Sequence, residues 1–186
     1  MDHHLDYRDQ LAASLESLDL SKVALIRELM EQARETGRQV FLCGNGGSAA
    51  TASHMANDLG KGASCGRSKR FKVIALTDNL SWITALANDI SYAAIFSEQL
   101  RNQGGPEDVL IAISGSGNSQ NVLNAAATAR ELGMKTVGLI GFGGGKLAAA
   151  VDLPLVVDSH HMGRVEDLHM VVLHMICYHF MEASAS

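Results

Sequence analysis

The sequence is poor in several residues and patterns that mark particular classes of protein. Its 186 residues include 2 prolines, 3 cysteines and 5% aromatic residues. Apolar residues nowhere continue for the roughly 18 positions that a membrane-spanning helix needs. The cysteines are odd in number and far apart, which favours neither a disulfide framework nor a thiolate zinc site. Lys and Arg total 15 against 20 Asp and Glu, so the chain lacks the excess of basic residues that grips a nucleic-acid backbone.

These absences set the first expectations. We expect no membrane span and no nucleic-acid partner. The N-terminal segment MDHHLDYRDQ is polar and lacks the apolar core of a signal peptide, so we expect a protein of the reducing cytoplasm. The length and the 47% apolar content fit one globular domain. We place it over residues 1–186, with N-terminal helices in 1–37 and an α/β core in 38–186.

Short apolar runs and helical patterns alternate along the chain. Apolar residues from about 7 to 38 recur at helical spacing, which predicts two helices broken near 19–21. A final helix is expected over about 163–183. Five runs typical of strands buried on both faces lie between them, at 39–43, 71–76, 109–113, 135–140 and 153–157. The pattern predicts an α/β three-layer sandwich, in which a five-stranded parallel sheet of flavodoxin-like order 2-1-3-4-5 has helices on both faces.

Glycine is the residue present in excess, with 18 in all, and two glycine-rich loops stand out. The first predicted strand leads into 44–48 (GNGGS) and the third into 114–119 (SGSGNS), each directly before a helix. Glycine lets the backbone approach a ligand closely, and free N–H groups at a helix start favour an anion. Serine and glycine could instead form tight turns with serine N-caps. Two such loops at the predicted reversal point of the sheet favour a phosphate site.

Two other glycine patterns are weaker signals. Residues 44–49 match the dinucleotide pattern GxGxxG/A, but no acid ends the second predicted strand about 20 residues later. Residues 143–146 (GGGK) precede Leu147, where a P-loop requires Ser or Thr. We interpret the second pattern as a turn before a short helix.

Polar residues on two predicted helices suggest chemistry beyond anion binding. His54 and Asp58 are four residues apart and project from one helix face. This spacing suits two metal ligands or an acid and a base, although exposed pairs of this kind are common. On the final helix, Glu166 and His174 fall on the face opposite an apolar stripe. That face also carries the apolar Leu173, so we expect it to meet another subunit or a cleft.

The apolar stripe of the final helix is predicted to pack on the sheet. It comprises Val165, Leu168, Val171, Val172, Met175 and Ile176. Among the histidines near the C-terminus, His179 is expected on this stripe and His169 on its border. Only His174 combines a position away from the stripe with a carboxylate companion.

Together these segments resemble the sugar isomerase (SIS) domain and, within it, the bacterial phosphoheptose isomerases. The likeness extends over nearly the whole chain. It rests on CGNGGSAATASHMANDL (43–59), the Ala-Asn-Asp stretch (87–89), ISGSGNSQNV (113–122), GLIGFGGGKLA (138–148) and RVEDLHMVVLHMI (164–176). The resemblance implies an aldose–ketose isomerase that converts D-sedoheptulose 7-phosphate into D-glycero-D-manno-heptose 7-phosphate through an enediol. It also implies a homotetramer with active sites at subunit interfaces.

The resemblance further implies roles for individual residues. Asp58 and His174 correspond to the family's catalytic acid and histidine, which move protons. The residues expected to line the sugar are Asn45, Gly46, Gly47, Ser48, Asn88, Asp89 and Glu166. Those expected at the phosphate are Ser114, Gly115, Ser116 and Ser119. One zinc ion per subunit is expected on His54, Asp58, Glu166 and His174.

The chain departs from the family pattern at four positions. Asp58 stands where the family usually has Glu, Glu166 where it has Gln, Gly115 where Thr is common, and Gly163 where some members have Asp. Two histidines and two carboxylates remain a suitable zinc set, with one more negative charge.

Two other functions stay open. One is a non-catalytic SIS protein that binds a phosphosugar or a partner protein, as a regulator of replication initiation does, and the other is an isomerase of another phosphosugar.

Overall fold

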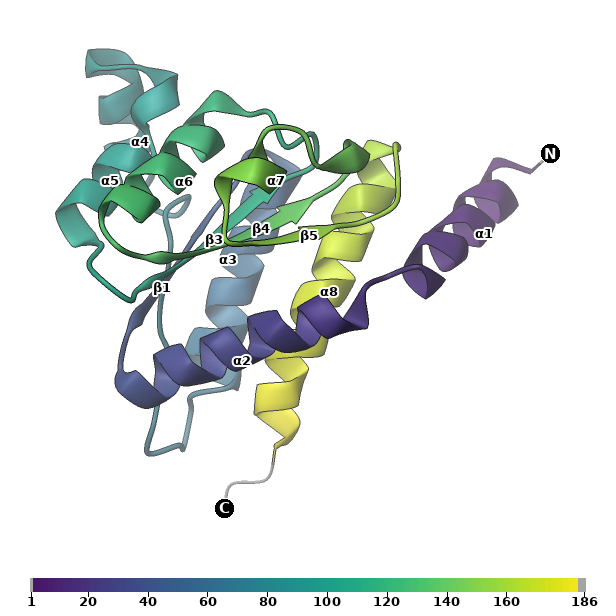
Figure 1. The fold of residues 1–186 in the computed structure, drawn as a ribbon, viewed down its shortest axis with the longest axis horizontal. Helices are drawn as coiled ribbons and strands as arrows, with labels where there is room; N and C mark the ends of the chain where they lie inside the picture. Colours follow the sequence, from purple (N-terminus) through teal and green to yellow (C-terminus); the bar gives the residue numbers. More distant parts are fainter. Residues whose placement is uncertain (1, 184–186) are drawn as a thin grey trace.

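The computed structural model describes residues 2–183, and its elements follow the predicted alternation (Figure 1). The strands are β1 (Gln39–Cys43), β2 (Lys72–Ala75), β3 (Val109–Ser114), β4 (Lys135–Ile140) and β5 (Leu153–Val156). The helices are α1 (His3–Glu16), α2 (Leu20–Thr36), α3 (Gly47–Asn57), α4 (Leu80–Asp89), α5 (Ser97–Gln103), α6 (Gln120–Glu131), α7 (Leu147–Ala150) and α8 (Met162–Glu182). Short turns form η1 (Asp58–Gly62), η2 (Tyr92–Ala94) and η3 (Phe142–Gly144). Among these described elements, no helix is both long and apolar enough to cross a membrane.

The five strands form one parallel sheet in the order β2-β1-β3-β4-β5, which confirms the predicted flavodoxin-like order. Strands β1 and β3 are neighbours, with Val40 opposite Val109 and Cys43 opposite Ala112. Because the two strands are parallel, their carboxyl ends meet at one edge of the sheet. The two glycine-rich loops therefore begin side by side.

Helices cover both faces of the sheet, as the alternating side chains of its strands require. Val40 and Leu42 of β1 belong to a core shared with α2, α3 and α8. Phe41 and Cys43, on the other face, belong to a core shared with α5, α6 and α7. The sheet thus lies between two helical layers, which confirms the three-layer α/β architecture.

The two N-terminal helices are separated where the sequence predicts. The Asp19 side chain accepts hydrogen bonds from the backbone N–H groups of Ser21 and Lys22 and so caps α2. Helix α1 has no buried residue and projects beyond the rest of the molecule in Figure 1. It is tied to α8 by the Tyr7 hydroxyl, which donates to Asp167 at 2.5 Å.

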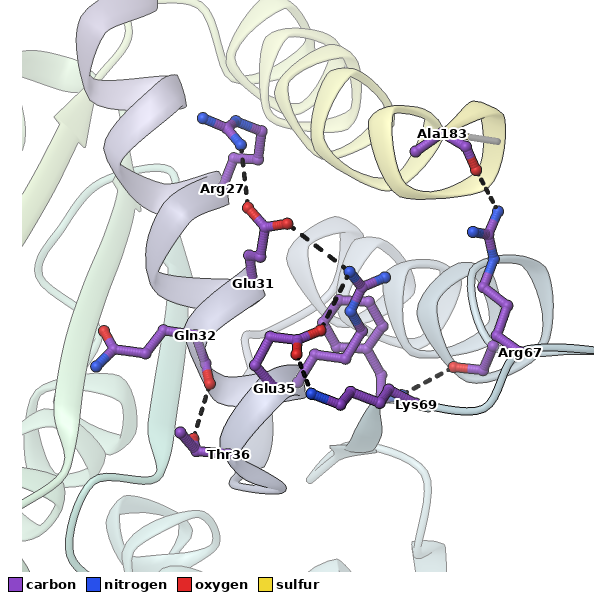
Figure 2. Close-up of polar contacts among 11 residues, drawn as sticks. Arg27, Glu31, Gln32, Glu35, Thr36, Arg67, Lys69 and Ala183 are labelled. Atoms are coloured by element: carbon purple, nitrogen blue, oxygen red, sulfur yellow. Dashed lines mark hydrogen bonds and ion pairs between the residues drawn. The ribbon is translucent and has the colours of Figure 1, made fainter. Parts of the chain in front are cut away.

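Polar contacts fix the C-terminal end of α8 (Figure 2). The Arg67 guanidinium donates to the carbonyl groups of Met181 and Ala183, at 2.9 Å each. These carbonyls belong to the end of a helix, where cations are favoured. In the same loop Lys69 pairs with Glu35 of α2. The loop after η1 therefore holds together the ends of α2 and α8.

The face of α8 that packs on the core is rotated relative to the predicted stripe. Four stripe residues are buried, namely Val165, Leu168, Val172 and Ile176. Met175 is 41% exposed, however, and Leu173, predicted on the opposite face, is 1% exposed. The predictions for Met175 and Leu173 were wrong because α8 packs against α2 and α3 as well as the sheet, which shifts its buried side.

His169 and His179 of this helix differ in burial, and the prediction that His179 lies on the apolar stripe was wrong. His179 is exposed, whereas His169 is buried. Within the described residues, neither ring nitrogen of His169 has a well-aligned hydrogen-bond partner. Burial lowers the pKa of His169 to about 4, against a smaller opposing effect of the Ile140 carbonyl group. His169 is therefore a neutral imidazole at neutral pH.

The buried His169 predicts a specific loss of stability in acid. Its pKa in the folded protein lies below the value of 6.5 for a free side chain, so its stabilising effect is complete above that value and is lost as the pH falls towards 4. Between about pH 7 and 4.5 we expect this group to cost about 2 kcal/mol of unfolding free energy. A His169→Leu variant should lack this loss. Urea denaturation at both pH values measures it, and an unchanged pH dependence in the variant would contradict the assignment.

Candidate functional site

A cavity of about 260 Å³ opens at the carboxyl ends of β1 and β3, where the strand order reverses. Both glycine-rich loops line it, and the start of α8 closes one side. The lining residues are Asn45, Gly46, Gly47, Ser48, Ile113, Ser114, Gly115, Ser116, Ser119, Met162 and Glu166. The structure therefore brings loops 44–48 and 114–119 together at one site.

The loop after β3 presents hydroxyl groups to this cavity. Ser119 is the N-cap residue of α6, but its side chain makes no capping hydrogen bond. Its hydroxyl instead lies 3.5 Å from that of Ser114, and both residues line the cavity with Ser116. Hydroxyl groups rotate to donate, and the first N–H groups of α6 add a partial positive charge. The loop can hold a phosphate without Lys or Arg.

A second glycine segment supports this loop from behind. Between β4 and α7, the N–H of Gly141 donates to the Gly115 carbonyl at 3.0 Å, and that of Leu147 donates to the Gly117 carbonyl at 2.9 Å. Gly117 has φ +66°, and a Cβ there would collide with the Gly144 carbonyl oxygen. The GGGK segment forms the expected turn before a short helix. It also fixes the shape of the loop after β3 (114–119), which we call the serine loop.

The loop after β1 brings Glu166 into the cavity. Gly47 is the first residue of α3, and a Cβ there would collide with the Glu166 carboxyl group. The carboxylate thus lies against the N-terminus of α3, where negative charge is favoured. Glycine at 47 is what allows α8 to place this acid beside the serine loop.

His54, Asp58 and His174 form a cluster at the far end of α3. The Nε2 atom of His54 lies 3.3 Å from Asp58 Oδ2 and 3.2 Å from His174 Nε2. His174 Nε2 lies 3.8 Å from the same Asp58 oxygen. Among the described residues, these three are the group of metal-ligating side chains that the structure gathers within 4.8 Å. Three of the four expected zinc ligands are therefore together, whereas Glu166 lies at the cavity.

Asp58 is positioned by a feature that the sequence analysis missed. At this residue α3 changes into the π-helical turn η1, in which the Ala63 N–H donates to the Asp58 carbonyl at 2.8 Å. Single π turns often mark functional sites, since they redirect a side chain within a helix. The buried Cys177 lies close by, and burial followed by the Asp58 charge raises its thiol pKa to about 12. Cys177 therefore stays protonated in the metal-free protein, and it is not among the ligand groups that the structure gathers with His54, Asp58 and His174.

The cavity and the cluster lie along one seam between α3 and α8. Gly47 faces Glu166 at one end, and His54 faces His174 at the other, so the two helices run in the same direction. Seven residues separate Gly47 from His54, which corresponds to about 10 Å along the helix. The seam places a cavity that can hold an anion and a cluster of acid–base groups at a distance that an extended phosphosugar can span.

Asn88 and Asp89 lie elsewhere in this chain. Both are exposed at the end of α4, and Asn88 Nδ2 donates to Asp89 Oδ1 at 2.7 Å. They do not line the cavity. Two residues that the sequence analysis did not single out, Tyr92 and Asn121, hydrogen-bond to Asn45. They are 47 and 76 positions from it, so no local spacing could reveal the contact.

Comparison with known proteins finds a family, relatives and solved structures that this chain resembles. Residues 6–141 match the model of the SIS domain family. A phosphoheptose isomerase of Helicobacter pylori strain P12 is 40% identical over 93% of this chain and 89% of its own length. The structure of phosphoheptose isomerase GmhA from Neisseria gonorrhoeae superposes with a TM-score of 0.88, at 32% identity over 97% of this chain and 96% of that one. A phosphoheptose isomerase from Francisella tularensis superposes with a TM-score of 0.89 at 29% identity, over 96% and 95% of the two chains.

Proposed function

The chain belongs to the phosphoheptose isomerase family of SIS-domain proteins, and from this premise we propose that it converts D-sedoheptulose 7-phosphate into D-glycero-D-manno-heptose 7-phosphate. The observation that carries the proposal is the seam between α3 and α8. One end of the seam has a cavity suited to a phosphate group, and the other end has the cluster of His54, Asp58 and His174. The reaction needs a phosphate anchor and acid–base groups at the opposite end of the sugar.

The serine loop anchors the substrate. Ser114, Ser116 and Ser119 donate to the phosphate together with the N–H groups at the start of α6. The glycines at 46, 47 and 115 let the backbone approach it. Binding energy gained at the phosphate, which does not react, is available to orient C1 and C2 at the other end.

The donor set of the cluster fits a zinc ion. Ligand atoms about 2.0–2.1 Å from a tetrahedral zinc ion lie about 3.3 Å from one another. The separations of 3.2, 3.3 and 3.8 Å among His54, Asp58 and His174 are close to this value. Two imidazoles and one carboxylate are typical of catalytic zinc sites, which keep a position open for substrate. When bound, zinc supplies Lewis acidity at the carbonyl oxygen of the substrate.

The chain's own residues move the protons. His174 cannot bind a metal and accept a proton through the same Nε2 atom. The Asp58 carboxylate has a second oxygen, so we assign to it the proton that passes between C1 and C2 through the enediol. His174 transfers protons to and from the substrate oxygens when its Nε2 atom is not bound to a metal. Glu166, beside the cavity, contacts the sugar phosphate near the serine loop.

We further propose a homotetramer with active sites at subunit interfaces. Helix α1 buries no residue of its own. Leu20 and Leu80 are 61% and 71% exposed. A partner covering these surfaces would remove apolar area from water. It would also allow Asn88 and Asp89, which do not line the cavity of their own chain, to line the sugar bound to a neighbouring one.

Two smaller proposals complete the functional assignment. We propose a single domain over 1–186, supported by α8, which lies beyond the SIS match and packs into the same core.

We also propose that the protein works in the reducing cytoplasm, where its three free cysteines would persist as thiols.

Incubation with sedoheptulose 7-phosphate tests the proposed activity. NMR should show formation of the aldoheptose phosphate, at a rate that falls on treatment with a chelator and recovers when zinc is returned. Tight binding of the phosphosugar without conversion would contradict the proposal and favour a non-catalytic SIS protein. Conversion of a different phosphosugar alone would move the assignment to another isomerase.

A further inference from the structure

Asn45, which lines the cavity, is held in a closed hydrogen-bond network with Asn121 and Tyr92. Asn45 Nδ2 donates to Asn121 Oδ1 at 2.9 Å, and Asn121 Nδ2 donates back to Asn45 Oδ1 at 2.8 Å. The Tyr92 hydroxyl donates to the same Asn45 oxygen at 2.9 Å. The three residues come from the loop after β1, the first turn of α6 and η2. The network therefore ties three segments together beside the cavity.

A backbone N–H group fixes the orientation of the side-chain amides of Asn121 and Asn45. The N–H of Val122 donates to Asn121 Oδ1 at 3.0 Å, and a backbone N–H can only donate. Asn121 must therefore turn its oxygen towards Val122 and Asn45 Nδ2, and its nitrogen towards Asn45 Oδ1. It follows that Tyr92 faces an acceptor and has to donate. The orientation of Asn45 is thus set through Asn121 by the start of α6.

This orientation leaves Asn45 one group for a ligand. Its oxygen already accepts two hydrogen bonds and one of its two N–H groups is engaged, so a single N–H remains. Building on the proposed function, we infer that Tyr92 and Asn121 are positioning residues that hold Asn45 as a single donor towards an acceptor oxygen of the bound phosphosugar. A reversed amide would turn a lone pair towards that oxygen and repel it.

Tyr92 can be altered without disturbing the fold. Its side chain is 58% exposed. The turn η2 is also held to α6 by Asn124, whose Nδ2 donates to the Ala93 carbonyl at 3.0 Å. A Tyr92→Phe variant therefore removes one hydrogen bond to Asn45 and leaves η2 attached.

A double-mutant cycle between Tyr92 and Asn45 tests the inference. Tyr92→Phe is expected to lower kcat/KM about three- to tenfold, the usual range for one lost hydrogen bond, with an unchanged melting temperature. In an Asn45→Ala background the same change should cost less than about twofold, because Tyr92 acts through Asn45. Equal losses in both backgrounds, or no loss in the wild-type background, would overturn the inference.

Asn121→Asp tests the polarity of the network. The carboxylate cannot donate to Asn45 Oδ1 and would repel that oxygen in either orientation of the Asn45 amide, so Asn45 should move out of its position and kcat/KM should fall at least about tenfold. Asn102→Asp makes the same change at an exposed site on α5 and should keep the wild-type value. Asn121 is buried, so a melting curve is recorded to check that Asn121→Asp folds. If Asn121→Asp does not fold, Tyr92→Phe still tests the inference. A folded Asn121→Asp protein with wild-type kcat/KM would contradict the inference.

Failure of the network can be told apart from failure of the proposed function. If the wild-type protein shows no isomerisation, the proposed function fails. The same cycle is then measured as the Kd of sedoheptulose 7-phosphate by calorimetry. A loss for Tyr92→Phe in the wild-type background alone supports the network, and equal losses or none overturn it.

Discussion

Replacing Asp58 with Asn is expected to lower kcat for isomerisation by at least about a thousandfold while the protein stays folded. The amide keeps the shape of the carboxylate but cannot take up the carbon-bound proton. Asp58 Oδ2 also lies 3.3 Å from His54 Nε2 and 3.8 Å from His174 Nε2, so the variant loses the negative charge shared by both imidazoles. Binding of inorganic phosphate should persist, because the serine loop lies at the other end of the seam.

A second cluster variant and a control variant accompany Asp58→Asn. His174→Ala should lose turnover to a similar degree, since its side chain belongs to the same cluster. Glu131→Gln also removes one negative charge, at the exposed end of α6 where Glu131 pairs with Arg101, and should keep the wild-type kcat. Steady-state kinetics, zinc content and phosphate binding are measured on each sample. Near-normal turnover by either cluster variant would refute the assignment.

The second large effect is expected at the serine loop, where Gly117→Ala should destabilise the protein by about 3 kcal/mol and weaken phosphate binding. Gly117 has φ +66°, which costs an L residue about 1–2 kcal/mol. Its new Cβ would also collide with the Gly144 carbonyl oxygen, and overpacking of this kind costs about 1–3 kcal/mol. Relief of the clash has to separate the two loops, which moves the phosphate-binding hydroxyls.

Gly143→Ala is the matched control for this variant. Gly143 has φ +75°, so it carries the same backbone strain, but a Cβ there meets nothing within 4 Å. It should therefore cost about 1 kcal/mol and leave the affinity for inorganic phosphate unchanged. Denaturant unfolding and phosphate titration compare the two. Equal effects of both substitutions would show that loop packing does not shape the site.

Much of the fold could be predicted because its signals are local. Strands buried on both faces show as continuous apolar runs, and β1 and β4 have the predicted bounds. Asp19 caps α2 at the predicted break. The convergence of the two glycine-rich loops also followed from the sequence, since the flavodoxin-like order makes β1 and β3 neighbours.

The features that could not be predicted depend on packing between distant segments. A helical wheel gives the spacing of apolar residues but not how many neighbours a helix has, so it misplaced Leu173 and Met175 once α8 packed against α2 and α3. The π turn at Asp58 leaves no periodic signal. Glu166 and His174 are eight residues apart on α8, and only the parallel packing of α3 assigns one to the cavity and the other to the cluster.

Isomerisation of sedoheptulose 7-phosphate in D2O, followed by NMR, tests proton transfer at the Asp58 cluster most directly. A carboxylate that removes the C1 proton exchanges it with solvent before returning it to C2. We therefore expect the wild-type protein to form the aldoheptose phosphate with deuterium at C2, and Asp58→Asn to form almost none. Binding without conversion, or a product whose C2 carries only hydrogen from the substrate's C1, would contradict the proposed mechanism.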